Sequence, residues 1–298
     1  MRLAAVLIAM LLGGPALAQT DPWAGAARSP GRIAAIATAL NEEAWFMPGG
    51  PGADGRPALL KARVLRPPVS GPFMVAIINH GSPPSASGRP VMPVPSYRAA
   101  SEWFVARGYM VVLPLRRGYG ESGAWPETYG PCRDPNFVAA GTATADDIEA
   151  IVRYLRTLPP VRRDRVLLVG QSAGGFGVVA ASARNPEGVF AAINFAGGRG
   201  GHQGGQANEN CVPDRLVQAA GSFGRGAKVP MLWLYTQNDT FFAPSLSRRM
   251  HEAYHAAGGN AAYVLLPAFK KDGHEMFGQA DGLALWTDPV AAFLARLE

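Results

Sequence analysis

The sequence has few of the residues that mark nucleic-acid-binding, zinc-binding and membrane-spanning proteins. Charged residues make up 17% of the 298 residues, and the net charge of +6 comes from scattered positions without a long basic run. Because nucleic-acid-binding domains usually carry a basic patch, we expect no nucleic-acid partner. The two cysteines, Cys132 and Cys211, lack the close spacing of zinc ligands. No apolar run is long enough to span a bilayer, which predicts no stable membrane insertion.

The N-terminal residues have the order of a secretory signal. Arg2 precedes an apolar run from Leu3 to Leu12, and Ala16-Leu17-Ala18 supplies small residues at the positions of a cleavage site. We therefore expect residues 1–18 to be a signal peptide that is cleaved near Ala18, leaving an exported protein, periplasmic or secreted. In an oxidising compartment the two cysteines favour a disulfide over free thiols.

Buried strand-like runs alternate with helix-like stripes along residues 19–298. This pattern predicts one α/β domain with a mostly parallel sheet that helices cover on both faces. The predicted strands are 59–65, 73–79, 109–115, 166–169, 189–195, 229–236 and 261–266. Residues 19–58 are predicted to form an N-terminal arm with a helical piece around Ile33–Leu40, and Leu59–Leu65 an edge strand.

Two insertions interrupt the alternation, both after strands. One spans residues 116–143 and carries Cys132; the other spans residues 197–228, is rich in glycine and carries Cys211. Ligands of α/β sheets bind at the carboxyl ends of strands, so both insertions are expected at the active-site edge. A disulfide would tie them together there, and the second could act as a lid. Tyr119, His202 and Phe242 are candidate pocket residues.

A Gly-x-Ser-x-Gly motif joins a buried strand to a helix of small residues. The motif is Gly170-Gln171-Ser172-Ala173-Gly174. In a nucleophile elbow, the serine lies on a strained turn that exposes its hydroxyl above the sheet. Ser172 is therefore the candidate nucleophile. The alternative interpretation is a glycine-rich helix start that only packs closely on the sheet.

A nucleophilic serine needs a base, and the base needs an acidic residue to orient it. His274 lies between the last strand and the last helix, and Asp239 follows the strand at 229–236. The order Ser172, Asp239, His274 is that of α/β hydrolases. Asp272 and Asp281 are weaker candidates for the acid because neither directly follows a strand.

An oxyanion hole requires two backbone N–H groups, one of them from the residue after the nucleophile. That residue is Ala173. The second donor is expected in the loop after Asn79, where Pro83 has no N–H and Ser82 is the better candidate. His80 is then expected to shape this loop.

Taken together, these motifs resemble an α/β-hydrolase-fold serine hydrolase of the dienelactone-hydrolase-like and prolyl-oligopeptidase-like branch. The resemblance rests on His80-Gly81, on the stretch RRGYGESG at residues 116–123, on the elbow and on the two triad partners. It implies two-step hydrolysis of a small-molecule ester through an acyl-enzyme on Ser172, without a cofactor. Classical dienelactone hydrolases carry a cysteine where this chain has Ser172.

Other functions compete with this hypothesis. Acyl transfer to another acceptor and peptide cleavage would use the same triad, and a non-catalytic binder could retain the scaffold. His251-Glu252-Ala253-Tyr254-His255 matches the zinc-protease motif H-E-x-x-H on a predicted helix. An amphipathic helix with Met250 and Tyr254 turned inward explains the same residues, so we expect no metal site.

Overall fold

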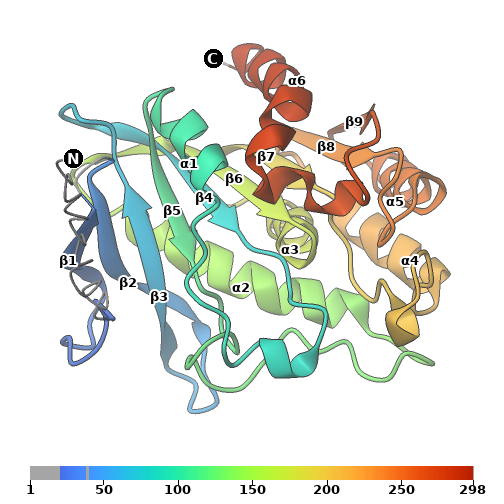
Figure 1. Cartoon of the computed structure of the whole chain (residues 1–298), viewed down its shortest axis with the longest axis horizontal. Coiled ribbons are helices and arrows are strands. Elements are labelled where there is room, and N and C mark those ends of the chain that lie inside the picture. The colour runs from blue at the N-terminus through green and yellow to red at the C-terminus, as the bar shows by residue number, and fades with distance from the viewer. Residues whose placement is uncertain (1–20, 38–39, 298) are drawn as a thin grey trace, which may run out of the picture.

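Strands and helices alternate in the chain and fold into one twisted sheet with helices on both faces (Figure 1). The computed structural model describes residues 21–37 and 40–297, so the predicted signal peptide lies outside the described residues. Within these ranges the sheet has nine strands, β1 (Gly31–Ala37), β2 (Glu42–Pro51), β3 (Pro57–Leu65), β4 (Phe73–Asn79), β5 (Tyr109–Pro114), β6 (Val161–Gln171), β7 (Val189–Phe195), β8 (Met231–Thr236) and β9 (Ala261–Leu266). Their order is β1-β2-β3-β5-β4-β6-β7-β8-β9, and β4 to β9 run parallel to one another.

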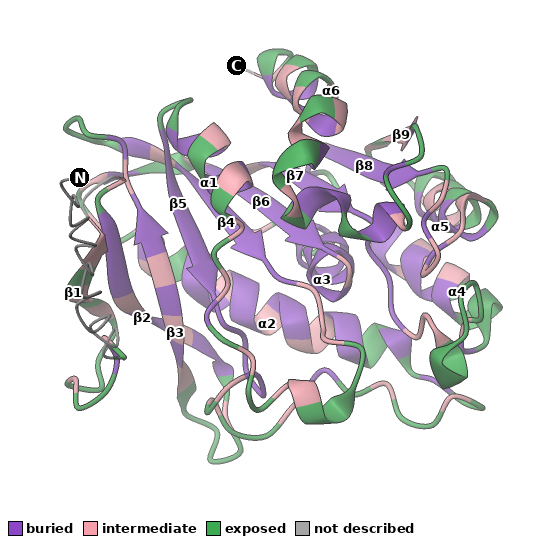
Figure 2. Ribbon diagram, viewed as in Figure 1, coloured by how far each residue is buried: buried purple, intermediate pink, exposed green. Residues whose placement is uncertain are grey.

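The central strands are buried over most of their length, and the buried parts are mainly apolar because helices cover both faces of the sheet (Figure 2). In β6, Leu168 packs into the core on one face, and Leu167 and Val169 pack into the core on the other. The first core is covered by α2 (Phe137–Leu155), α3 (Ala173–Ser182), α4 (Pro213–Gly224) and α5 (Pro244–Ala256), and the second by α1 (Arg98–Val105) and α6 (Leu283–Ala295). The predicted fold class is confirmed.

The N-terminal arm differs from the prediction. Where a helix was expected at Ile33–Leu40, the chain forms β1, which pairs antiparallel with β2. Register shifts interrupt this pairing, and Ile33 and Ile36 pack against the same small core as Trp23. A bulge lets residues three apart share one face of a strand, which imitates helical spacing. Because β1 and β2 add to the sheet, β3 lies inside it and is not the predicted edge strand.

Both insertions are partly absorbed into the core. Helix α2 begins at Phe137, where Asn136 caps it, so the first loop is shorter than predicted. In the second insertion, residues 213–224 form α4, whose Leu216 and Ala220 are fully buried. The part of this insertion before α4 is therefore limited to residues 196–212, and that it acts as a lid stays a prediction. Among the described helices, none has the length and apolar character of a membrane span.

The predicted bridge between the insertions is present. Cys132 and Cys211 form a disulfide with a Cα–Cα distance of 4.9 Å and a sequence separation of 79 residues. It joins the loop before α2 to the loop before α4. A cross-link that closes so long a loop restricts the unfolded chain, which raises the free energy of unfolding.

We expect the double variant C132S/C211S to lose up to about 4 kcal/mol of unfolding free energy. Urea denaturation with and without a reductant measures this loss. Reduced wild type should unfold at the same urea concentration as the variant, and the variant should not respond to the reductant. A wild type that is unaffected by complete reduction would contradict the prediction.

Candidate active site

The turn at Ser172 lifts this residue above the carboxyl edge of the sheet. Ser172 connects β6 to α3 with φ 54° and ψ −121°, a backbone conformation that is rare for a residue with a side chain. The flanking glycines permit the turn. A Cβ on Gly170 would lie 2.4 Å from the Gly174 carbonyl oxygen, and a Cβ on Gly174 would lie 2.2 Å from the Asn79 carbonyl oxygen. The motif is thus required by close backbone packing on both sides of the serine.

Three side chains from distant parts of the sequence meet at this edge. His274 Nε2 lies 2.9 Å from Ser172 Oγ, and His274 Nδ1 lies 3.2 Å from each carboxylate oxygen of Asp239. Asp239 and His274 are buried, whereas Ser172 is partly exposed. Asp239 Oδ1 also accepts the backbone N–H groups of Phe241 and Phe242, each at 2.9 Å. The sequence therefore predicted the proximity of all three residues correctly.

Asp272 holds the loop that carries the histidine. It accepts the Thr240 and His274 backbone N–H groups at 3.1 and 2.9 Å, and it contacts the Thr240 hydroxyl. Burial tends to raise the pKa of the Asp272 carboxyl, but these hydrogen bonds outweigh burial and lower it. Its carboxylate joins the Asp239 loop to the His274 loop without contacting the imidazole ring.

The loop after β4 offers a backbone donor beside the serine. The Gly81 N–H donates to the Tyr97 hydroxyl at 3.2 Å, whereas the Ser82 N–H donates to no acceptor in the described part of the chain. Ser82 and Ser172 line the same cleft. Ala173 is the first residue of α3, so its N–H has no acceptor within the helix. Of the two predicted donors, Ala173 thus follows Ser172 in the chain and Ser82 lines the same cleft.

The cleft above Ser172 has a volume of about 280 Å³ and is lined mainly by the loop after β4. The predicted pocket residues Tyr119, His202 and Phe242 do not line it. Instead, Phe241 forms a wall, and it stacks on His274 at 4.2 Å and on His202 at 3.5 Å between ring centroids. Phe242, the next residue in the chain, is buried. The predicted pocket residues therefore lie one layer behind the surface that faces Ser172.

Gln171 and Tyr97, which the sequence analysis missed, link the loop after β4 to the segment that carries His274. Gln171 Nε2 donates to the His274 carbonyl oxygen at 3.1 Å, and Gln171 Oε1 accepts the Tyr97 hydroxyl at 3.0 Å. Burial of that hydroxyl raises the pKa of Tyr97 to about 12, so it stays protonated. Gln171 could have been noticed as the neighbour of Ser172 in the motif. Tyr97 carries no comparable signal, since it lies in a loop 75 positions earlier.

His80 is a buried, neutral histidine. Its Nε2 accepts the Arg116 backbone N–H at 3.2 Å, so its proton lies on Nδ1, which donates to the Gly81 carbonyl oxygen at 2.7 Å. Burial, together with the charge of Arg116, lowers the pKa of His80 to about 3. His80 thus shapes the loop that carries Ser82.

The H-E-x-x-H residues are engaged elsewhere. His251 Nε2 contacts the Ala261 carbonyl oxygen at 2.9 Å, so this nitrogen carries a proton and is not open to a metal. Tyr254 is buried, as the amphipathic interpretation requires. In the described ranges, no group of three or more His, Cys, Asp or Glu side chains is placed to hold a metal ion.

The profile of the Dienelactone hydrolase family matches residues 94–282, more than half of the sequence. The chain belongs to the dienelactone hydrolase family. No curated protein matches the sequence. Membership in this family identifies the chain as a hydrolase, and residues 94–282 include all three members of the Ser172 site.

Solved structures share the fold of this dienelactone hydrolase family member at low sequence identity. An esterase from Pyrococcus furiosus is 16% identical with a TM-score of 0.59, over 90% of this chain and 96% of that one. Dipeptidyl peptidase 4 from Porphyromonas gingivalis is 16% identical with a TM-score of 0.61, over 86% of this chain and 35% of that one. A puromycin-hydrolysing peptidase from Mycobacterium tuberculosis is 18% identical with a TM-score of 0.57, over 89% of this chain and 40% of that one.

The low pKa of His80 predicts a pH-dependent stability. Between pH 6.5 and about 3, the unfolded chain binds a proton at His80 that the folded chain does not. The contribution of neutral His80 to stability is therefore complete above pH 6.5 and is lost as the pH falls toward 3, by at most about 1.4 kcal/mol per pH unit.

We expect the stability difference between wild type and His80→Gln to shrink as the pH falls from 7 to 4, measured by urea denaturation. His255→Gln, at an exposed histidine, is the control and should show a constant difference. A difference for His80→Gln that does not change with pH would contradict the neutral state of His80.

Proposed function

We propose that this family member is an exported serine hydrolase that cleaves carboxylic esters through an acyl-enzyme on Ser172. The observation that carries the proposal is the hydrogen-bonded series Ser172 Oγ, His274 and Asp239, with contacts of 2.9 and 3.2 Å. A histidine that is held by a buried carboxylate can accept the serine proton during attack. Export is supported by the N-terminal signal pattern and by the disulfide.

In the proposed reaction each group has a separate task. Ser172 Oγ attacks the ester carbonyl carbon while His274 Nε2 accepts its proton, and the oxyanion receives hydrogen bonds from the N–H groups of Ala173 and Ser82. The intermediate then expels the alcohol, which takes the proton from His274. Water next gives a proton to the same histidine and attacks the acyl-enzyme, and the bond to Ser172 Oγ then breaks, which releases the acid as Oγ takes the proton from His274. The partial exposure of Ser172 gives water access for this step.

The size of the cleft above Ser172 favours a small ester as the substrate. The cleft of about 280 Å³ accommodates a short acyl or alcohol group.

Replacement of Ser172 by Ala should reduce kcat for a short ester by roughly 10⁴-fold or more, because the nucleophile is lost. It should also abolish labelling by a fluorophosphonate probe. Ser182→Ala, at a buried serine near the end of α3, is the matched control and should keep wild-type rates. A folded Ser172→Ala variant with near-native turnover would reject the proposed nucleophile.

A larger pocket adjoins the cleft and would receive the bulky part of a substrate. Its volume is about 850 Å³, and its walls include Trp23, Ile36 and Leu115. Met92 belongs to the walls of both cavities. The side chain of Met92 is flexible and partly exposed, so it can separate or connect the two spaces.

Met92→Trp should therefore lower kcat/KM roughly tenfold for esters with a bulky aryl or branched group. It should leave acetate esters of small alcohols within about threefold of wild type, since these fit the cleft alone. Val69→Trp, at an exposed position outside both cavities, is the control. Equal losses for small and bulky esters would contradict a substrate path past Met92.

A further inference from the structure

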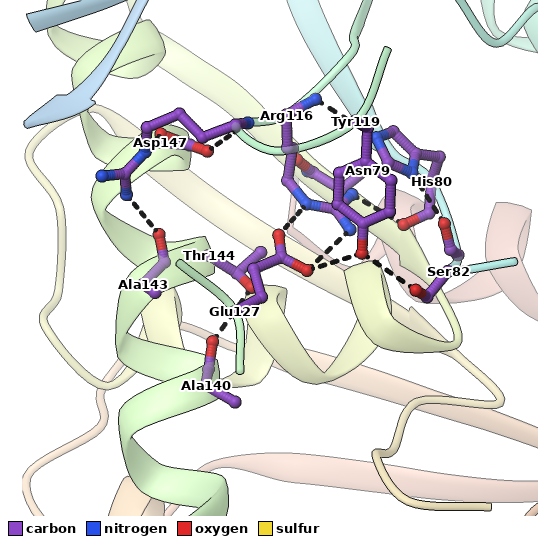
Figure 3. Close-up of polar contacts among 12 residues, drawn as sticks. Asn79, His80, Ser82, Arg116, Tyr119, Glu127, Ala140, Ala143, Thr144 and Asp147 are labelled. Atoms are coloured by element: carbon purple, nitrogen blue, oxygen red, sulfur yellow. Dashed lines mark hydrogen bonds and ion pairs between the residues drawn. The ribbon is translucent and has the colours of Figure 1, made fainter. Parts of the chain in front are cut away.

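A buried carboxylate lies directly behind the loop that carries Ser82. Glu127 is fully buried and contacts Arg116 Nε at 2.6 Å, Arg199 Nη2 at 2.6 Å and the Tyr119 hydroxyl at 2.9 Å. Figure 3 shows the Glu127 carboxylate facing both Arg116 and the Tyr119 hydroxyl, with Ser82 on the other side of that hydroxyl. Tyr119 Oη lies 3.0 Å from Ser82 Oγ. Glu127 is thus connected to Ser82 through one hydroxyl.

The charges of the arginines determine the direction of these hydrogen bonds. Burial would raise the pKa of Glu127, but Arg116 and Arg199 outweigh it and hold the pKa well below its usual range. A carboxylate only accepts hydrogen bonds, so the single hydroxyl proton of Tyr119 points to Glu127. The oxygen of Tyr119 then accepts the Ser82 hydroxyl proton.

This connection brings together three loops at the carboxyl edge of the sheet. Tyr119 and Glu127 lie between β5 and α2, Arg199 lies in the loop of residues 196–212, and Ser82 follows β4. Arg116 also donates to the His80 carbonyl oxygen at 2.6 Å, and the His80 ring meets the Tyr119 ring edge-on at 4.6 Å. The position of Tyr119 is therefore fixed on several sides, and its hydroxyl is a fixed partner for Ser82.

We propose that Tyr119 is a positioning residue that, anchored on Glu127, holds Ser82 so that the Ser82 N–H faces the oxyanion. The proposal rests on the proposed function and adds a residue to it. Tyr119 does not line the cleft and touches no substrate. Its effect passes through Ser82, and a hydrogen-bond donor must be placed accurately to favour the transition state over the bound substrate.

Tyr119→Phe tests this role because it removes one oxygen and keeps the ring. Glu127 retains both arginines, so the ion pairs stay intact. We expect kcat for a short ester to fall on the order of tenfold with KM within about twofold, because a misplaced donor weakens only the transition state. Tyr254→Phe, whose hydroxyl contacts a methionine sulfur, is the matched control and should retain wild-type kinetics.

A boronic acid that forms a tetrahedral adduct on Ser172 separates positioning from general loosening of the structure. Its inhibition constant should rise by the same factor by which kcat/KM falls in Tyr119→Phe, while the thermal midpoint stays near that of Tyr254→Phe. A Tyr119→Phe enzyme with wild-type kcat would overturn the proposal. So would a lower midpoint accompanied by an unchanged inhibition constant.

A double variant tests whether the effect of Tyr119 on activity passes through Ser82. If Tyr119 acts through the Ser82 hydroxyl, Ser82→Ala and S82A/Y119F should lose the same activity, because the second change removes nothing further. If the losses of activity in the two single variants multiply in S82A/Y119F, Tyr119 does not act through Ser82. Activity retained by Ser172→Ala would overturn the proposed function and this role together. An inactive Ser172→Ala beside an unimpaired Tyr119→Phe would overturn only the role of Tyr119.

Discussion

The left-handed backbone at Ser172 is the constraint around which the carboxyl edge of the sheet is built. A residue with a side chain in such a conformation costs about 1–3 kcal/mol, so the surrounding structure must hold it. Here α3 follows Ser172 immediately, and the Asn79 carbonyl oxygen approaches so closely that position 174 has no room for a Cβ. The same close approach brings β4 and its following loop beside the serine. One packing requirement therefore places both the hydroxyl and the Ser82 backbone.

Buried charge organises the layer behind this edge. Glu127 interacts with Arg116 and Arg199, two cations from different loops, and all three groups are almost fully excluded from solvent. Loss of Glu127 would leave two buried cations without a counter-charge, which is strongly destabilising. The loop that carries Glu127 and the loop that carries Arg199 are also joined by the disulfide. Ionic and covalent links thus hold the same pair of loops behind the carboxyl edge of the sheet.

The parts that the sequence predicted are those with local signals. The apolar runs located the parallel strands, and the glycine motif with the triad order located Ser172, Asp239 and His274. The helix expected at Ile33–Leu40 was wrong because bulges in β1 produce helical spacing in a strand. Tyr97, Phe241 and Glu127 could not be placed, since their roles depend on contacts between residues far apart in the chain. The disulfide was an exception because only two cysteines were available.

The same division explains why family membership identifies a hydrolase without identifying a substrate. The proposed catalytic residues lie at the ends of β6 and β8 and in the short helical segment 273–278, and the relatives with this fold include both an esterase and peptidases. The cleft, in contrast, is formed by loop residues such as Met92 and Phe241. Loops vary more than strands do, so a fold that is shared at sequence identities of 16–18% does not define the walls of the cleft. Substrate choice in this chain must therefore be sought in Met92 and Phe241, which line the cleft and take no part in the proposed bond changes.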